Sequence, residues 1–126
     1  MRFFALSFLS LALCLGFTAR AEFKVPPLTG PVMDEVGYLN RSDRQELTQL
    51  LYDFNRRGKA QIQVLIVNSL EGEPIEQASI QITDKWKLGD KVKDNGVLFL
   101  ISAQDRAMRI EVGQRSEEHT SELQSH

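Results

Sequence analysis

The chain contains 126 residues, with 15 Lys and Arg against 17 Asp and Glu, which gives a net charge of −2 at pH 7. This near balance, without a run of like charge, argues against a nucleic-acid partner. The single Cys, Cys14, and both His, His119 and His126, lie near the chain ends, which excludes disulfides, thiol and imidazole catalysis and the usual zinc sites from residues 22–114.

The first 21 residues are predicted to be a secretory signal peptide. Arg2 precedes an apolar stretch over residues 3–17, and Ala19 and Ala21 supply a small-x-small cleavage site. The stretch is shorter than the roughly 20 apolar residues that span a bilayer. We therefore expect export across the inner membrane and a mature chain that begins at Glu22.

The mature chain is predicted to open with an extended lead-in and a loop before its first helix. Residues 22–31 hold three prolines and a glycine, and residues 32–39 are interpreted as a loop that packs a few side chains. Apolar residues at helical spacing predict a helix over residues 43–57, with Ser42 and Gln45 as its capping box. The expected core side chains of this helix are Leu47, Leu50, Leu51 and Phe54.

A strand and a second helix are predicted next. Residues 61–67, QIQVLIV, form a β-branched apolar run that is typical of a central strand covered on both faces. Residues 75–88 fit both strand alternation and one helical face. Their length and the preceding Pro74 favour a helix.

The last predicted element is a β-hairpin. Residues 96–102 form an apolar run typical of a buried strand, and residues 103–105 form the turn. Residues 106–112 then alternate, so that Met108, Ile110 and Val112 share one face while Arg109 and Glu111 share the other.

The order strand, helix, strand and antiparallel strand predicts an α/β fold built on a βαβ-containing mixed sheet. Such sheets collect functional residues at the carboxyl ends of their parallel strands. Here this edge includes Asp105 and Arg106. Asp94 comes just before the strand over residues 96–102.

Several short motifs together resemble one known family. They are Asp34, Gln61, Ile75-Glu76, Trp86-Lys87-Leu88-Gly89, Asp94-Asn95-Gly96, Asp105-Arg106 and Arg109-Ile110-Glu111-Val112-Gly113. With these motifs, residues 32–113 resemble the TPM domain of YgcG-like bacterial envelope proteins. Ser79 departs from the family pattern, which has a bulky residue there. The resemblance implies a three-layer sandwich with helices on both faces of the mixed sheet.

The end of the chain departs further from the family. Family members continue through a Gly-Tyr-Gly-Leu-Glu segment to a later Asp and further helices, whereas this chain has Gln114 at the Tyr position. Residues 115–126, RSEEHTSELQSH, resemble the in-frame translation of a common sequencing adapter. We interpret them as non-native and the TPM-like domain, residues 32–114, as incomplete. The last strand would then be an edge with uncovered apolar side chains, and the fragment is expected to fold poorly.

The resemblance implies two competing functions, and enzymatic activity is left open. The favoured one is a module of the cell envelope that binds an unidentified envelope protein in assembly or maintenance, with divalent-cation binding as an open point. The alternative is a weak acid phosphatase assisted by Ca²⁺ or Mg²⁺, the cations that carboxylates prefer. Its metal ligands would be Asp34, Asp94 and Asp105, and its catalytic residues Asp94, Asp105 and Arg106, with Arg106 holding the phosphate. Asp94 and Asp105 could equally be turn residues.

The resemblance also implies where the protein works. Full-length relatives often carry a membrane segment downstream of the domain. Whether a segment beyond residue 114 anchors the intact protein is left open, and we expect the protein to reside in the periplasm or cell envelope.

Overall fold

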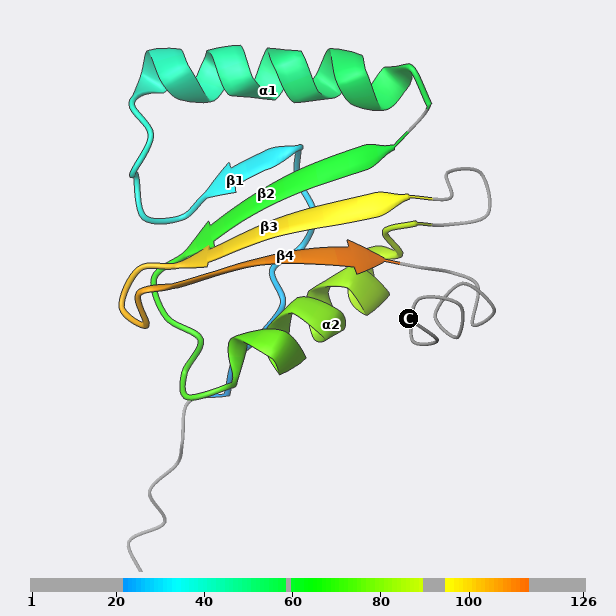
Figure 1. The fold of residues 1–126 in the computed structure, drawn as a ribbon. Helices are drawn as coiled ribbons and strands as arrows, with labels where there is room; N and C mark the ends of the chain where they lie inside the picture. The colour runs from blue at the N-terminus through cyan, green and yellow to red at the C-terminus, as the bar shows by residue number, and fades with distance from the viewer. Residues whose placement is uncertain (1–21, 59, 90–94, 114–126) are drawn as a thin grey trace, which may run out of the picture.

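The computed structural model describes residues 22–58, 60–89 and 95–113. In chain order these residues form β1 (Val32–Asp34), α1 (Arg41–Arg56), β2 (Gln61–Val67), α2 (Ile75–Trp86), β3 (Gly96–Ser102) and β4 (Ala107–Gly113), as Figure 1 shows. The predicted signal peptide, the adapter-like tail and Asp94 lie outside the described residues.

The four strands form one mixed sheet in the order β1-β2-β3-β4. The strand pairs β1 with β2 and β2 with β3 are parallel, and β4 runs antiparallel to β3. The helix α1 lies on one face of the sheet and α2 on the other (Figure 1). The predicted α/β fold, with a βαβ unit and helices on both faces, is confirmed.

The strand β1 is not expected from the sequence, and the loop prediction for residues 32–39 is wrong at its start. Val32–Asp34 pairs with Val64–Ile66 of β2. The pairing is extended by hydrogen bonds from Val64 N–H to the Pro31 carbonyl and from Glu35 N–H to the Ile66 carbonyl, both at 2.9 Å. Three residues are too few to show an alternating pattern, and the strand depends on its long-range backbone partner.

The helix α1 begins two residues earlier than predicted, and its cap is different. Asn40 is the N-cap residue, with extended backbone angles. Its Oδ1 accepts a hydrogen bond from Asp43 N–H at 2.7 Å, and its Nδ2 donates to Asp43 Oδ2 at 3.0 Å. The predicted capping box of Ser42 and Gln45 is therefore wrong, because Asn40 and Asp43 form the reciprocal pair two positions earlier.

Only part of the expected core of α1 is buried. Leu51 is buried and Leu47 half-buried, whereas Leu50 is 64% exposed and Phe54 is exposed as well. The reason is that α1 packs on β1 and β2 and on no other element among the described residues. Leu50 and Phe54 are four residues apart, so they share a flank of the helix that extends past this contact.

The main hydrophobic core lies between α2 and the sheet. It consists of Met33, Leu65, Val67, Leu70, Ala78, Ile82, Leu88, Leu98 and Leu100. Residues of the lead-in close one side of this core, where Phe23 and Val25 pack against it. Trp86 Nε1 donates a hydrogen bond to the Pro26 carbonyl at 2.9 Å, which holds the lead-in against the end of α2.

The chain passes very closely over itself where α2 leads into the next loop. Lys87 adopts a left-handed conformation, with a φ of 53°, and ends α2 two residues before the predicted end. A Cβ atom added to Gly96 would meet the backbone of Leu88 and Gly89, and one added to Gly113 would meet the Leu88 carbonyl oxygen. Glycine is required here because the exit of α2 lies directly against the ends of β3 and β4.

Candidate functional site

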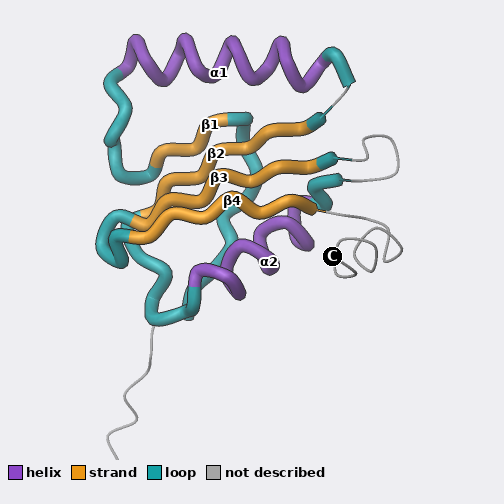
Figure 2. Tube along the Cα trace, viewed as in Figure 1, coloured by secondary structure: helices purple, strands orange, loops and turns teal. Residues whose placement is uncertain are grey.

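The carboxyl ends of the three parallel strands lie at one edge of the sheet, which the sequence predicts for β2 and β3 and to which β1 adds a third strand end. The registers place Asp34 beside Ile66, and Val67 beside Ser102. Figure 2 shows the loops that follow β1, β2 and β3 gathered at this edge. Two of the predicted site residues, Asp34 and Asp105, follow this arrangement and lie at the same edge.

Asp105, in the turn between β3 and β4, is bound to neighbouring loops. Its Oδ2 accepts a hydrogen bond from Ser102 Oγ at 2.6 Å and another from Leu70 N–H at 2.9 Å. The Ser102 hydrogen bond is the main cause that lowers the pKa of Asp105, and the Leu70 N–H adds to it. Asp105 is therefore a carboxylate at neutral pH that holds the β2–α2 loop to the hairpin turn.

Asp34, at the end of β1, organises the loop before α1. Its Oδ1 accepts from Val36 N–H at 3.1 Å and Gly37 N–H at 2.8 Å, and its Oδ2 accepts from Leu39 N–H at 2.8 Å. Partial burial is the largest single influence and raises its pKa. The backbone N–H groups, that of Tyr38 included, together outweigh burial, so the pKa of Asp34 lies below its usual value.

Asp34 and Asp105 follow strands that are not neighbours in the sheet. Their strands β1 and β3 are separated by β2, which places the two strands about 10 Å apart. Each carboxylate is already bound by the N–H or O–H donors of its own surroundings. Among the described residues, no three His, Cys, Asp or Glu side chains come together in a way that could hold a metal ion. Asp94 lies outside these residues, so its predicted role as a ligand stays a prediction.

Arg106 follows Asp105 in the turn and is exposed. Its backbone is left-handed, with a φ of 48°, which is unusual for a residue other than Gly. Within the described part of the chain, its guanidinium makes no hydrogen bond or ion pair. The group is therefore free to bind an anion from solution.

The second feature of the site is a sheet face that no helix covers within the described ranges. We call it the open apolar face, and it consists of Val97, Phe99, Ile101, Met108, Ile110 and Val112. These side chains form three cross-strand pairs between β3 and β4. On β4 they are exposed, Ile110 by 53%, because α2 packs on the opposite face and α1 reaches only β1 and β2.

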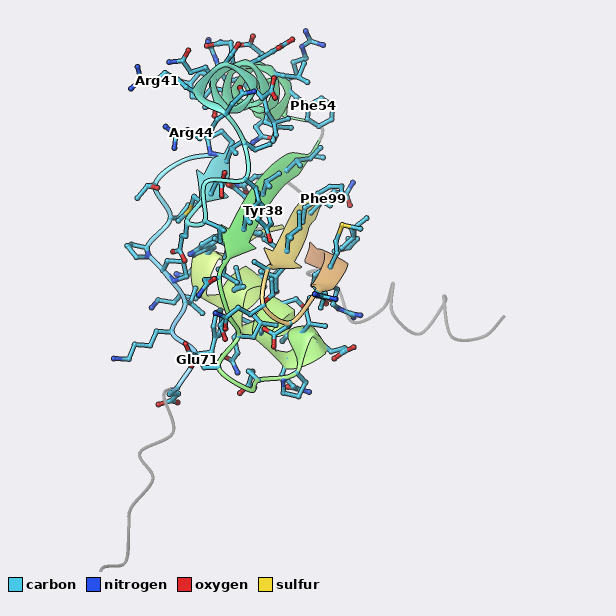
Figure 3. The ribbon with its side chains drawn as sticks, turned by 90° about the vertical axis from the view of Figure 1, so that its left-hand side faces the viewer. Tyr38, Arg41, Arg44, Phe54, Glu71 and Phe99 are labelled. Atoms are coloured by element: carbon cyan, nitrogen blue, oxygen red, sulfur yellow. The ribbon has the colours of Figure 1, made fainter. Side chains whose placement is uncertain are left out.

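The open apolar face extends toward α1. Figure 3 shows Phe54 of α1 and Phe99 of β3 on the same side of the molecule. The sequence predicts uncovered apolar side chains on the last strand, and this is confirmed for β4. The continuous apolar run of β3 is typical of a strand covered on both sides, and no helix of the described residues covers it on this face.

The charged residues of β4 face α2. Arg109 Nε lies 2.9 Å from Glu111 Oε2, and Glu111 is only 18% exposed. The fully buried Ser79 of α2 has its Oγ 3.2 Å from the same Glu111 oxygen and 2.9 Å from the Glu76 carbonyl oxygen. The position at which the sequence departs from the TPM pattern thus contacts a carboxylate of β4.

A shallow hollow lies near the opposite end of the strands, away from their carboxyl ends. It is lined by Asp53, Arg56 and Arg57 at the end of α1. This position is remote from Asp34 and Asp105, because α1 runs away from the edge that holds them. Neither helix of the described region is long and apolar enough to cross a membrane.

The protein therefore belongs to the α/β class. Its mixed sheet carries one helix on each face, and polar residues lie at the carboxyl ends of the parallel strands. The family model of the TPM domain matches residues 32–126, and the chain belongs to this family. No curated protein matches the chain.

Proposed function

We propose that the protein is an extracytoplasmic binding module of the cell envelope that uses the open apolar face as its contact surface. One observation carries this proposal: β4 places Met108, Ile110 and Val112 on the uncovered face and its charged residues under α2. A sheet face in contact with water is normally polar. Contiguous exposed apolar side chains are typical of a surface that binds another protein.

The shape of this face supports a helix as the bound element. One helix, α1, covers β1 and β2, and the two remaining strands leave a strip about 10 Å wide, close to the diameter of one helix. Phe54 lies on the same side of the molecule as Phe99 and borders the strip from the side of α1, and Leu50, four residues earlier, shares its flank of the helix. The proposed ligand is therefore an amphipathic helix of an envelope protein, bound by its apolar stripe.

A binding experiment tests this proposal on the purified chain that begins at Glu22. The probe is a fluorescent Leu/Lys peptide designed as an amphipathic helix, and the reference peptide has the same composition in scrambled order. We expect the ordered peptide to bind more tightly. Phe99→Gln and Leu50→Gln should each weaken its binding, whereas Tyr52→Gln, an exposed change elsewhere on α1, should not. Equal affinity for both peptides, or equal loss in all three variants, would exclude this face.

A cation-assisted phosphatase is the second candidate function. It is favoured by the free guanidinium of Arg106 beside Asp105, because a planar guanidinium suits phosphate oxygens. The bonds that hold Asp105 to Ser102 and Leu70 count against a catalytic role for that carboxylate.

Hydrolysis of p-nitrophenyl phosphate at acidic pH, with Ca²⁺ or Mg²⁺ added, distinguishes the two functions. The binding-module proposal predicts no turnover above the blank. Turnover that Arg106→Gln and Asp105→Asn both abolish, in variants that melt as folded proteins, would replace it with the phosphatase.

A further inference from the structure

The strand β4 is a long edge strand, which borders the sheet along one side. Within the described residues it pairs with β3 alone, and it contains seven residues without Pro or Lys. The other edge strand, β1, has only three residues. Natural edge strands are usually kept short, interrupted by Pro or Lys, or protected by charged side chains that point inward, because their free backbone groups otherwise pair with another chain. β1 is short, whereas β4 is a full-length strand whose only charges are those of Arg109 and Glu111, on its α2 side.

The sequence of β4 is nearly symmetric about Ile110, with its charges opposed. Ala107 and Gly113 are small, and Met108 and Val112 are apolar. Between them, Arg109 and Glu111 carry opposite charges on either side of the centre. When such a strand pairs with a second copy of itself in the antiparallel direction, the charged positions meet opposite charges, and the apolar and small positions meet residues of their own kind.

We propose that a second copy of this chain adds its β4 to this edge, antiparallel, with Ile110 opposite Ile110. In this register Arg109 lies opposite Glu111 of the second copy, and Met108 lies opposite Val112. The contact is the same on both copies, so the assembly closes as a dimer with one continuous sheet. The proposed dimer contact is the backbone of β4 and not the open apolar face. The dimer therefore does not depend on the proposed helix binding.

Other registers are unfavourable. Antiparallel alignment centred on Arg109 or on Glu111 places like charges directly opposite one another, and parallel alignment in register places Arg109 beside Arg109. A shift by one residue sets charged side chains opposite apolar ones on the wrong faces of the sheet. Among alignments that pair the whole length of β4, the charges therefore favour the antiparallel one centred on Ile110.

The dimer would also enlarge the open apolar face. A twofold axis perpendicular to the sheet keeps both copies of α2 on one side and both open faces on the other. Met108, Ile110 and Val112 of the two copies then form one surface at the centre of the assembly.

Charge reversal tests the register, with mass measured by sedimentation across a concentration series of the purified chain from Glu22. We expect the wild-type chain to dimerise, and Arg109→Glu or Glu111→Arg alone to weaken dimerisation by about tenfold or more, because like charges then face each other. A mixture of the two variants should restore the dimer, since the acidic side chain introduced at position 109 of one copy then meets the basic side chain introduced at position 111 of the other. Glu46→Arg, an exposed reversal on α1, is the matched control and should dimerise as the wild type does.

A disulfide experiment gives a second readout that does not depend on the charges. Residues 22–126 contain no Cys, so a single introduced Cys reports its own neighbours. Ile110→Cys should form a covalent dimer under mild oxidation, whereas Leu50→Cys, also exposed, should stay monomeric. The proposal is wrong if the wild type is monomeric at every concentration, if both single reversals dimerise as well as the wild type, or if the two Cys variants cross-link equally.

Discussion

The Asp105 carboxylate accepts a hydrogen bond from the backbone N–H of Leu70 at 2.9 Å, across 35 positions of sequence. This bond joins the turn between β3 and β4 to the loop that follows β2. Leu70 is itself part of the buried core, so the bond fixes a core residue from the polar edge of the sheet. The residue that the sequence singles out for chemistry thus has a structural task.

The structural task of Asp105 can be tested with a double-variant cycle. Ser102 Oγ and Leu70 N–H donate to the same oxygen of Asp105, so both bonds are lost in Asp105→Ala and only one in Ser102→Ala. We expect both variants to melt at lower temperature than the wild type, Asp105→Ala more so. Because the groups share a contact, the double variant should melt close to Asp105→Ala. Additive losses in thermal melts followed by circular dichroism would show that the two side chains act independently.

Acid stability tests the hydrogen bonds of Asp34. Its pKa is lowered in the folded state, so the folded protein holds its proton less tightly than the unfolded chain, whose value is near 3.8. The stabilisation is fully present above about this pH and is lost as the pH falls through the lower folded pKa. Asp34→Asn should therefore be less stable at neutral pH and lose less stability on acidification. Urea unfolding at pH 7 and at stepwise lower pH measures both effects, and parallel curves for the two proteins would contradict the assignment.

Two leucines that the sequence predicts to be buried differ in their exposure in the structure. Leu100 is fully buried under α2, whereas Leu50 is 64% exposed. Leu100→Ala should lower the free energy of unfolding by about 2–5 kcal/mol, because it leaves a cavity in the core. Leu50→Ala should change it by no more than about 0.5 kcal/mol, as is usual for surface positions. Equal losses in urea unfolding would place Leu50 in the core, as the sequence suggests.

The elements with strong local signals can be predicted from the sequence, and the contacts between elements cannot. The amphipathic pattern of α1, the apolar run of β2 and the alternation of β4 each extend over a full element, so each is identified. The strand β1 is missed because its only support is backbone pairing with β2. The exposure of Leu50 and Phe54 is missed because helical spacing shows which residues share a flank and not how far the underlying sheet extends.

For the candidate site, too, the position of a residue in the fold can be predicted from the sequence, whereas its contacts cannot. The sequence places Asp105 at the carboxyl edge of the parallel strands, because topology alone determines that edge. It cannot show that the Asp105 carboxylate is held by Ser102 and Leu70, since that depends on the fold of a distant loop. Likewise, the alternation of Arg109 and Glu111 is visible, but only the position of α2 shows that these charges lie on its side of the sheet.

The close approach at the exit of α2 gives the last prediction. A side chain at Gly96 would meet the backbone of Leu88 and Gly89, which cannot move aside as a flexible side chain could. Gly96→Ala should therefore lower the free energy of unfolding by about 1–3 kcal/mol, the usual cost of overpacking. Gly30→Ala is the matched control, because an added Cβ there meets no atom within 4 Å. If urea unfolding shows Gly96→Ala to be as stable as Gly30→Ala, the α2 exit does not lie against the start of β3.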